Sequence, residues 1–425
     1  MATALDSFST LHTSTDSNQA NTTQWEMTAA LTPDLGYYVD SDDECEVESE
    51  CEPVLRYFED CWYCPLRIGK VVGGKIPYRI EHKLGHGGFS TVWLARNLFS
   101  QQLVALKVLS IHWRAEEERR MNHEISQRTG GDEAAYYLIT SQDSFYVKGR
   151  NALPHLVLVL PWRGPSLNTE CFHLPPSFRV PGAKDLLQAL ARLHVAGVVH
   201  SDINPGAAMW HIASLDRLET TELYGRLSRP RKVLQSEECG GGELVEPLHV
   251  PRSMLRPSLC LADFGHSFVS GTVLEDQAQS PMIYCAPERL HGVHPSFASD
   301  VWSFTQILAK LYLGIEITYG NGTKSVSRLV AALGPLPTHW RGSFFAAELE
   351  REWWYDQTCT LPRDPDSSYE SLEHKIDRLR PGICAEERRL ALDVFRKGFE
   401  YSPEKRITAA HLLSDPSFNA LMAYY

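Results

Sequence analysis

The stretch Leu193-His-Val-Ala-Gly-Val-Val-His-Ser-Asp202 and the later stretch Leu261-Ala-Asp-Phe-Gly265 carry the strongest fold signals in this chain. The first follows a predicted helix and ends in Asp202, which is placed to accept the proton of an attacking hydroxyl. In the second, apolar residues precede Asp263, a carboxylate suited to holding magnesium against phosphate oxygens. Because each short motif occurs often by chance, the prediction depends on the order of further motifs along the chain.

Three such motifs follow: Ala286-Pro-Glu288, Asp300-Val-Trp-Ser303 and the arginine of Pro-Glu-Lys-Arg406-Ile. We expect Glu288 and Arg406 to form a buried ion pair whose desolvation cost is offset by mutual hydrogen bonds. Asp300 begins a predicted helix, and we expect it to bind the backbone of the stretch that ends at Asp202.

A glycine-rich stretch, Leu84-Gly-His-Gly-Gly-Phe-Ser-Thr-Val92, lies between two predicted strands. Glycines allow a backbone to approach phosphates closely and to turn its N–H groups toward them. A Gly-rich hairpin turn is the simpler interpretation, and Ser90 stands where a third motif glycine would be. The phosphate interpretation is favoured by Val104-Ala-Leu-Lys107 on a following strand, from which a lysine can reach the phosphates.

Lys107 needs a carboxylate from a helix to hold its side chain in place, and our choice is Glu124. Residues 116–118 are all glutamates and offer rivals, although an exposed helical face explains any one of them equally well.

The elements predict an α+β fold. Alternating apolar and β-branched runs at residues 78–84, 90–96, 103–109 and 155–160 indicate a small antiparallel sheet, and residues 115–128 indicate one helix lying on it. After Gly164 the pattern turns helical, most clearly at residues 183–194, 299–313, 386–399 and 408–413.

Two segments of the 425-residue chain differ from this pattern. Residues 1–52 are polar, and eight of the thirteen residues from Asp40 to Glu52 are acidic, so we expect a disordered tail, followed by an extension over 53–77. Residues 213–257 are polar and contain Gly240 to Gly242, which predicts a flexible insert.

The formal net charge of −12 argues against general binding to nucleic acid. The sequence contains no run of about 18 apolar residues, so we do not expect a membrane-spanning helix. The ten cysteines are too sparse for a disulfide scaffold and favour the cytoplasm or nucleus. Cys61 and Cys64 have a zinc-like C-x-x-C spacing, but no second pair follows, so reduced thiols are the favoured interpretation.

From about residue 57 to residue 418 the chain resembles the protein kinases. The stretch Lys83-Leu-Gly-His-Gly-Gly-Phe-Ser-Thr-Val-Trp-Leu-Ala95 is similar to the SR-protein kinase branch in particular. So are His155-Leu-Val-Leu-Val-Leu160 with the following Gly164-Pro-Ser-Leu167, and the position of the insert. The resemblance implies a two-lobed fold, with residues 78–163 as the N-lobe and hinge and 164–425 as the C-lobe.

The resemblance also implies a serine/threonine kinase that uses ATP and Mg²⁺ to phosphorylate Arg/Ser-rich splicing factors. It implies no need for loop phosphorylation, because Ser201 replaces the arginine that would pair with a phosphorylated loop. The implied catalytic residues are Asp202, Lys107 and Glu124, and the implied metal ligand is Asp263. The implied ATP-contacting residues are Leu84, Gly85, His86, Gly87, Gly88, Phe89, Ser90, Val92, Ala105, Lys107, the gatekeeper Leu160, and Pro161 and Arg163 of the hinge.

Two positions in His200-Ser-Asp-Ile-Asn-Pro-Gly-Ala207 depart from the family pattern. Asn204 stands where the family has a lysine that steadies the γ-phosphate, and Ala207 stands where it has an asparagine that ligates a second magnesium. The loss of such groups predicts a slow enzyme, and it leaves a pseudokinase that works by contacting partners as the alternative. A general α+β binding protein is the third interpretation, and it requires all these motifs to be coincidental. We expect a monomer with a protein substrate, no direct nucleic-acid partner and no membrane partner.

Overall fold

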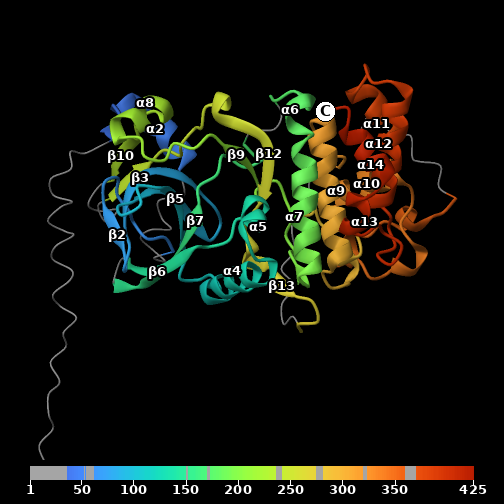
Figure 1. Cartoon of the computed structure of the whole chain (residues 1–425). Coiled ribbons are helices and arrows are strands. Elements are labelled where there is room, and N and C mark those ends of the chain that lie inside the picture. Colours follow the sequence, from blue (N-terminus) through green and yellow to red (C-terminus); the bar gives the residue numbers. More distant parts are fainter. Residues whose placement is uncertain are drawn as a thin grey trace, which may run out of the picture.

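The computed structural model describes residues 36–51, 53, 62–149, 152–169, 173–235, 242–273, 281–318, 323–358 and 370–425. Its elements form a mixed α+β fold, as predicted. Strands gather on one side of Figure 1 and most long helices on the other, with β9 (Ala208–Ile212) and β12 (Leu255–Leu261) between them.

The largest sheet has six strands in the order β2-β3-β4-β5-β7-β6, and every neighbouring pair is antiparallel. Its strands are β2 (Val71–Gly73), β3 (Pro77–His86), β4 (Ser90–Asn97), β5 (Leu103–Leu109), β6 (Asp143–Lys148) and β7 (Pro154–Pro161). The four predicted strands are confirmed as β3, β4, β5 and β7. The sheet begins at β2, before the predicted boundary at residue 78. Buried β-branched and aromatic side chains, including Ile80, Trp93 and Val157, form its core.

The helix predicted beside this sheet is confirmed as α4 (Ala115–Thr129). A short helix, α5 (Asp132–Tyr137), follows directly and packs against β12 and the helical part of the fold. Gly130 and Gly131, both with positive φ, separate the two helices.

The helical part is built around α7 (Gly182–Val195) and α9 (Phe297–Leu313). All fifteen residues from Ser299 to Leu313 are buried, so α9 lies inside the helical part, and its lysine, Lys310, pairs with Glu316. The other helices are α6 (Pro176–Arg179), α10 (Thr323–Leu333), α11 (Leu372–Leu379), α12 (Ala385–Gly398), α13 (Ala409–Leu413) and α14 (Pro416–Met422). The four predicted helices are confirmed as α7, α9, α12 and α13.

Two short ladders fix the loops that carry the two strongest motifs. Strand β8 (Val198–Val199) pairs with β13 (Phe268–Val269), and β9 pairs with β12, all antiparallel. Asp202 therefore lies between β8 and β9, and Asp263 lies between β12 and β13. Because each loop is held at both ends by the same pair of ladders, the two aspartates are placed in one region.

The expectation of a disordered tail through residue 52 is wrong for residues 36–51, and residues 1–35 lie outside the described part. Strand β1 (Tyr37–Tyr38) pairs with β10 (Arg231–Gln235), and α2 (Ser41–Glu50) packs beside them. Val47 of α2 is fully buried, and Arg231 pairs with Glu46 at 2.9 Å. The acidic charge that predicted disorder is thus partly balanced by an arginine of the insert.

The expectation of a flexible insert at 213–257 is also wrong for most of its length. The insert forms α8 (Thr220–Leu227), β10, β11 (Gly242–Val245) and the start of β12, while residues 236–241 lie outside the described part. Leu223 and Leu227 of α8 are buried against Leu94 and Leu103 of the large sheet. Apolar residues hidden in a polar composition therefore anchor the insert.

Within the described ranges, no helix has both the length and the apolar character needed to cross a membrane.

Candidate active site

Lys107 joins the two parts of the fold through a pair of ion pairs. Its Nζ lies 2.7 Å from Oε1 of Glu118 on α4 and 2.8 Å from Oδ1 of Asp263. Strand β5 directs the lysine into this position, and its side chain is 14% exposed. The predicted approach of Lys107 and Asp263, residues far apart in sequence, is confirmed.

The helix carboxylate that holds Lys107 is Glu118, and the choice of Glu124 is wrong. Glu118 is 2% exposed, whereas Glu124 lies on the outer face of α4 and pairs with Arg128 at 2.6 Å. The spacing of Glu118 to the buried Met121 and Ile125 places all three on one face of the helix, and this signal was available in the sequence.

Charge stabilises this triad of Lys107, Glu118 and Asp263. Burial disfavours the ammonium of Lys107, but Asp263 and Glu118 outweigh that effect and raise its pKa above the ordinary value. The nearby ammonium of Lys107 in turn lowers the pKa of Asp263 below its ordinary value and outweighs the partial desolvation of the carboxyl. Lys107 and Asp263 are therefore both ionised at neutral pH.

Trp113 is a residue that the sequence reasoning missed. Its indole N–H donates to Oε2 of Glu118 at 2.6 Å, so both oxygens of that carboxylate are bound. Its ring stacks on Phe89 at 4.4 Å and meets the ring of His266 edge-on at 5.1 Å. Trp113 thus connects the glycine-rich loop to the triad.

The glycine-rich loop lies between β3 and β4, as predicted, and a residue from before the sheet contacts it. The hydroxyl of Tyr63 donates to the carbonyl of Gly87 at 2.6 Å, and Tyr63 is 2% exposed. Within the loop, the Gly87 N–H donates to the carbonyl of Ser90 at 2.8 Å. No sequence motif marks Tyr63 as a member of the site.

The loop that contains Asp202 is fixed through its backbone. Asp300 accepts hydrogen bonds from the N–H groups of His200 and Ser201, both at 2.8 Å, which confirms the predicted anchoring role. Arg289 donates to the carbonyl of Ser201 at 2.7 Å. Ser201 has a φ of 71°, so the anchored loop also holds a non-glycine residue in the left-handed region.

Asp202 carries a buried acceptor oxygen, Oδ1, that has no hydrogen-bond partner among the described residues. Such an oxygen is costly to bury unless a substrate group completes it. The arrangement fits an aspartate that binds a hydroxyl donor.

Neither Asn204 nor Ala207 can perform the role of the lysine and the asparagine that the kinase pattern has at these positions. The Asn204 amide donates to the carbonyl of Asp202 at 3.0 Å, and its Oδ1 accepts from the Gly206 N–H at 2.8 Å, so its side chain is used within the loop. Ala207 is 1% exposed and offers only a methyl group.

Asp263 has the donor chemistry for magnesium. Its side chain is 50% exposed, and its φ of 65° turns it out of the β12 direction while Phe264 is buried in the core. Magnesium in phosphate sites is bound by one or two carboxylates together with phosphate oxygens, so Asp263 fits one such ion. No group of three or more metal-ligating side chains occurs among the residues described by the structure.

The predicted ion pair of Glu288 and Arg406 is confirmed. The two side chains are bidentate, at 2.7 and 2.9 Å, and both are at most 1% exposed. Arg406 also lies over the ring of Trp302 at 5.0 Å. This pair fixes the end of the segment that begins at Asp263.

The predicted hinge follows β7, in which Leu160 and Pro161 pair with Ala105 and Val104 of β5. The side chain of Arg163 folds back to donate to the carbonyl of Trp162 at 3.1 Å. Of the two cysteines with zinc-like spacing, Cys61 lies outside the described residues. Burial raises the pKa of Cys64 to about 11, which favours the thiol.

Comparisons with known proteins agree with this geometry. A serine/threonine protein kinase of Aspergillus fumigatus is 25% identical over 394 residues, covering 88% of this chain and 91% of the relative. The serine/threonine-protein kinase SRPK of Physarum polycephalum is 24% identical over 387 residues, covering 83% and 88%. The dual specificity protein kinase CLK1 of Homo sapiens is 28% identical over 178 residues, covering 40% and 34%. No protein-family model matches the chain.

The triad, the anchored aspartate loop and the similarity along most of the chain to proteins named serine/threonine protein kinases together support the protein kinase superfamily. Within that superfamily its character is SR-kinase-like, because relatives named SRPK and CLK1 are among those it matches.

Proposed function

We propose that this chain is a two-lobed, ATP-dependent serine/threonine protein kinase. The observation that carries the proposal is the position of Lys107, which lies within 2.8 Å of carboxylates from α4 and from the loop after β12. A lysine held this way presents a fixed positive charge to nucleotide phosphates. The names of the relatives support the kinase activity. The loops that carry Asp202 and Asp263 supply the carboxylates that this activity requires.

In the proposed reaction, the backbone of residues 85–92 covers the phosphates and Lys107 orients them. Asp263 would hold a magnesium ion, which when bound neutralises charge on the β- and γ-phosphates. The free oxygen of Asp202 accepts the proton of the attacking serine hydroxyl as the bond from oxygen to the γ-phosphorus forms and the bond to ADP breaks.

We further propose a protein substrate rich in Arg and Ser. The support is the similarity to relatives named SRPK and CLK1. Ser201, whose small side chain cannot pair with a phosphorylated loop, fits an enzyme that needs no loop phosphorylation. We also propose that the protein acts as a monomer in the cytoplasm or nucleus.

A slow enzyme or a pseudokinase is the second candidate, and Ala207 and Asn204 favour it. A methyl group cannot ligate a metal, and the Asn204 side chain is already bound within its own loop. Losing one charge-stabilising group of this kind typically lowers the rate about 10²- to 10³-fold.

The test is transfer of radioactive phosphate from ATP to an Arg/Ser-repeat peptide. Asp202→Ala should abolish labelling, because it removes the proton acceptor, whereas the exposed Asp42→Ala should label at the wild-type rate. Labelling by Asp202→Ala at the wild-type rate would falsify the assignment.

The Ala207→Asn variant separates the two candidates, because it restores an amide oxygen where the family has a metal ligand. A rise in turnover of about tenfold or more is expected if the missing ligand limits an active enzyme. If neither wild type nor Ala207→Asn labels the peptide, the chain is a pseudokinase.

A further inference from the structure

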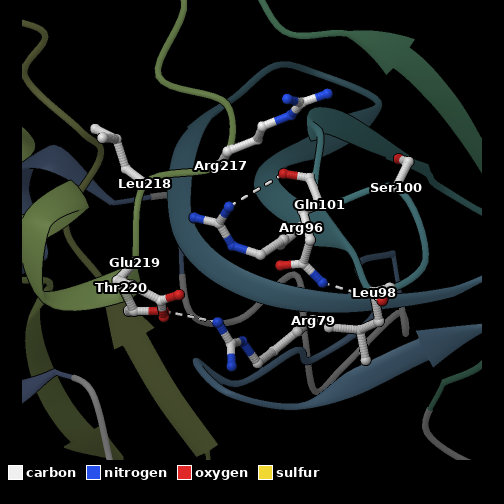
Figure 2. A pocket seen from close by; sticks show the side chains of 9 residues that line it. All are labelled: Arg79, Arg96, Leu98, Ser100, Gln101, Arg217, Leu218, Glu219 and Thr220. Carbon is white, nitrogen blue, oxygen red and sulfur yellow. Dashed lines mark hydrogen bonds between the residues drawn. The ribbon is translucent and has the colours of Figure 1, made fainter.

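A cavity of about 430 Å³ lies between the large sheet and the insert and shares no residue with the site described above. Its walls come from β3, β4, the turn after β4 and the segment that leads into α8. Figure 2 shows the lining residues, which are Arg79, Arg96, Leu98, Ser100, Gln101, Arg217, Leu218, Glu219 and Thr220.

Two of its arginines share one carboxylate. Oε1 of Glu81 accepts from Arg79 Nη2 at 2.8 Å and from Arg96 Nε at 3.1 Å. Arg96 is only 2% exposed, and its Nη2 is buried without a hydrogen-bond partner in the described part of the chain. Oε2 of Glu81 is likewise buried without a partner in the described residues, so this wall holds two guanidinium groups against one carboxylate that does not itself line the cavity.

The third arginine, Arg217, is exposed and has no ion pair among the described residues. Its φ of 65° holds it in the left-handed region, and Figure 2 shows its side chain extending above Gln101. The acid of the lining, Glu219, forms a capping box with Glu222 at the start of α8. The lining therefore carries three arginines and one carboxylate, which is already used as a helix cap.

The remaining lining suits a small oxyanion. Thr220 accepts from Arg79 Nη2 at 2.6 Å, which leaves its hydroxyl proton available for a ligand. The first turn of α8, an eight-residue helix, adds the positive end of a helix dipole. Among the described residues that line the cavity none is aromatic, so a nucleotide base would find no stacking partner.

We propose that this cavity binds a phosphate monoester carried on a protein side chain, with Arg217, Arg79 and Arg96 as its cations. Guanidinium groups bind phosphate oxygens through paired hydrogen bonds and favour a dianion over a carboxylate. The rim residues Ser100, Gln101, Arg217 and Glu219 are exposed, so a phosphate on a polypeptide can reach the cavity. The proposal does not depend on phosphotransfer.

Calorimetric titration of the full chain tests it, with inorganic phosphate and with an N-acetyl, N′-methylamide derivative of phosphoserine as probes. Saturable binding of both is expected, with the phosphoserine derivative at least as tight. Arg217→Glu should weaken both roughly tenfold or more, since it replaces a charged donor by a repelling acid. Arg217→Ala should weaken both in the same direction. Thermal unfolding should be unchanged, because Arg217 is exposed and unpaired.

Two controls locate the bound phosphate. Arg256→Glu makes the same change in charge at an exposed residue outside the lining and should bind both probes as wild type does. Lys107→Met removes the phosphate-orienting charge of the nucleotide site and should also leave binding unchanged. The proposal is overturned if neither probe binds saturably, or if only inorganic phosphate binds. It is likewise overturned if Lys107→Met abolishes binding that Arg217→Glu retains.

Discussion

At the scale of single residues, the site depends on how Glu118 is held. Its two oxygens are bound by Lys107 and by the indole of Trp113, at 2.7 and 2.6 Å. Six residues separate Glu118 from Glu124, which is about 600° of helix rotation and therefore a different face. Glu124 instead pairs with Arg128 near the surface.

Replacing each of the two glutamates by glutamine should have different effects on the rate. Glu118→Gln should lower the rate of peptide phosphorylation about 10²-fold, because a neutral amide no longer fixes the charge of Lys107. The matched control Glu124→Gln should stay within about twofold of wild type, as expected of an exposed pair. Initial-rate kinetics at saturating ATP measure both. A loss of rate confined to Glu124→Gln would instead support Glu124 as the partner of Lys107.

Sequence could have selected Glu118 over Glu124 but could not have selected Tyr63 or Trp113. Glu118 shares the helical spacing of the buried Met121 and Ile125, and that periodicity is written in the sequence. The contacts of Tyr63 with Gly87 and of Trp113 with Phe89 depend on how separate segments pack. Such packing has no local signature in the chain.

At the scale of elements, the strands predicted from the sequence are those whose side chains are buried in the core. β4 and β5 are buried along nearly their whole length. β2 has three residues and β6 is largely exposed, so neither carries the alternation that marks a half-buried strand. These edge strands are determined by pairing with β3 and β7 rather than by their own composition.

Strand β3 also holds a histidine that should make stability depend on pH. His82 is 4% exposed, and its Nδ1 accepts from the Lys83 N–H at 2.9 Å. Burial is the main cause that lowers its pKa from 6.5 to about 4, with a smaller contribution from His249. Between these values the unfolded chain binds a proton that the folded chain does not. The stabilisation is therefore complete above pH 6.5 and is lost as the pH falls toward 4.

Denaturant unfolding at pH 7 and pH 5 measures this effect. His82→Asn keeps an acceptor for the Lys83 N–H but cannot titrate. Its free energy of unfolding should therefore fall less between pH 7 and pH 5 than that of wild type, by about 2 kcal/mol. The exposed His411→Asn should keep the wild-type dependence. Because His155, His211 and His291 also have lowered pKa values, only the difference between variants is diagnostic. An identical dependence in His82→Asn would contradict this account of β3.

At the scale of the whole molecule, the order of motifs predicted which distant residues meet. Lys107 and Asp263 meet at 2.8 Å, as do Glu288 and Arg406 at 2.7 Å, because each pair belongs to one functional pattern. The association of α2 and β1 with the insert was not predictable, because the acidic and basic segments each appear disordered alone. Their pairing buries Tyr63, whose hydroxyl contacts the glycine-rich loop, so parts outside the motifs help to shape the site.

The central claim is that Lys107, Glu118 and Asp263 form one site for the phosphates of ATP. Calorimetric titration with magnesium and ATP tests it most directly, comparing wild type with Asp263→Asn and with the control Glu124→Gln. We predict saturable binding by wild type and Glu124→Gln, and binding at least about tenfold weaker by Asp263→Asn, since the amide loses the metal-binding charge. Absence of binding by wild type, or equal binding by Asp263→Asn, would contradict the claim.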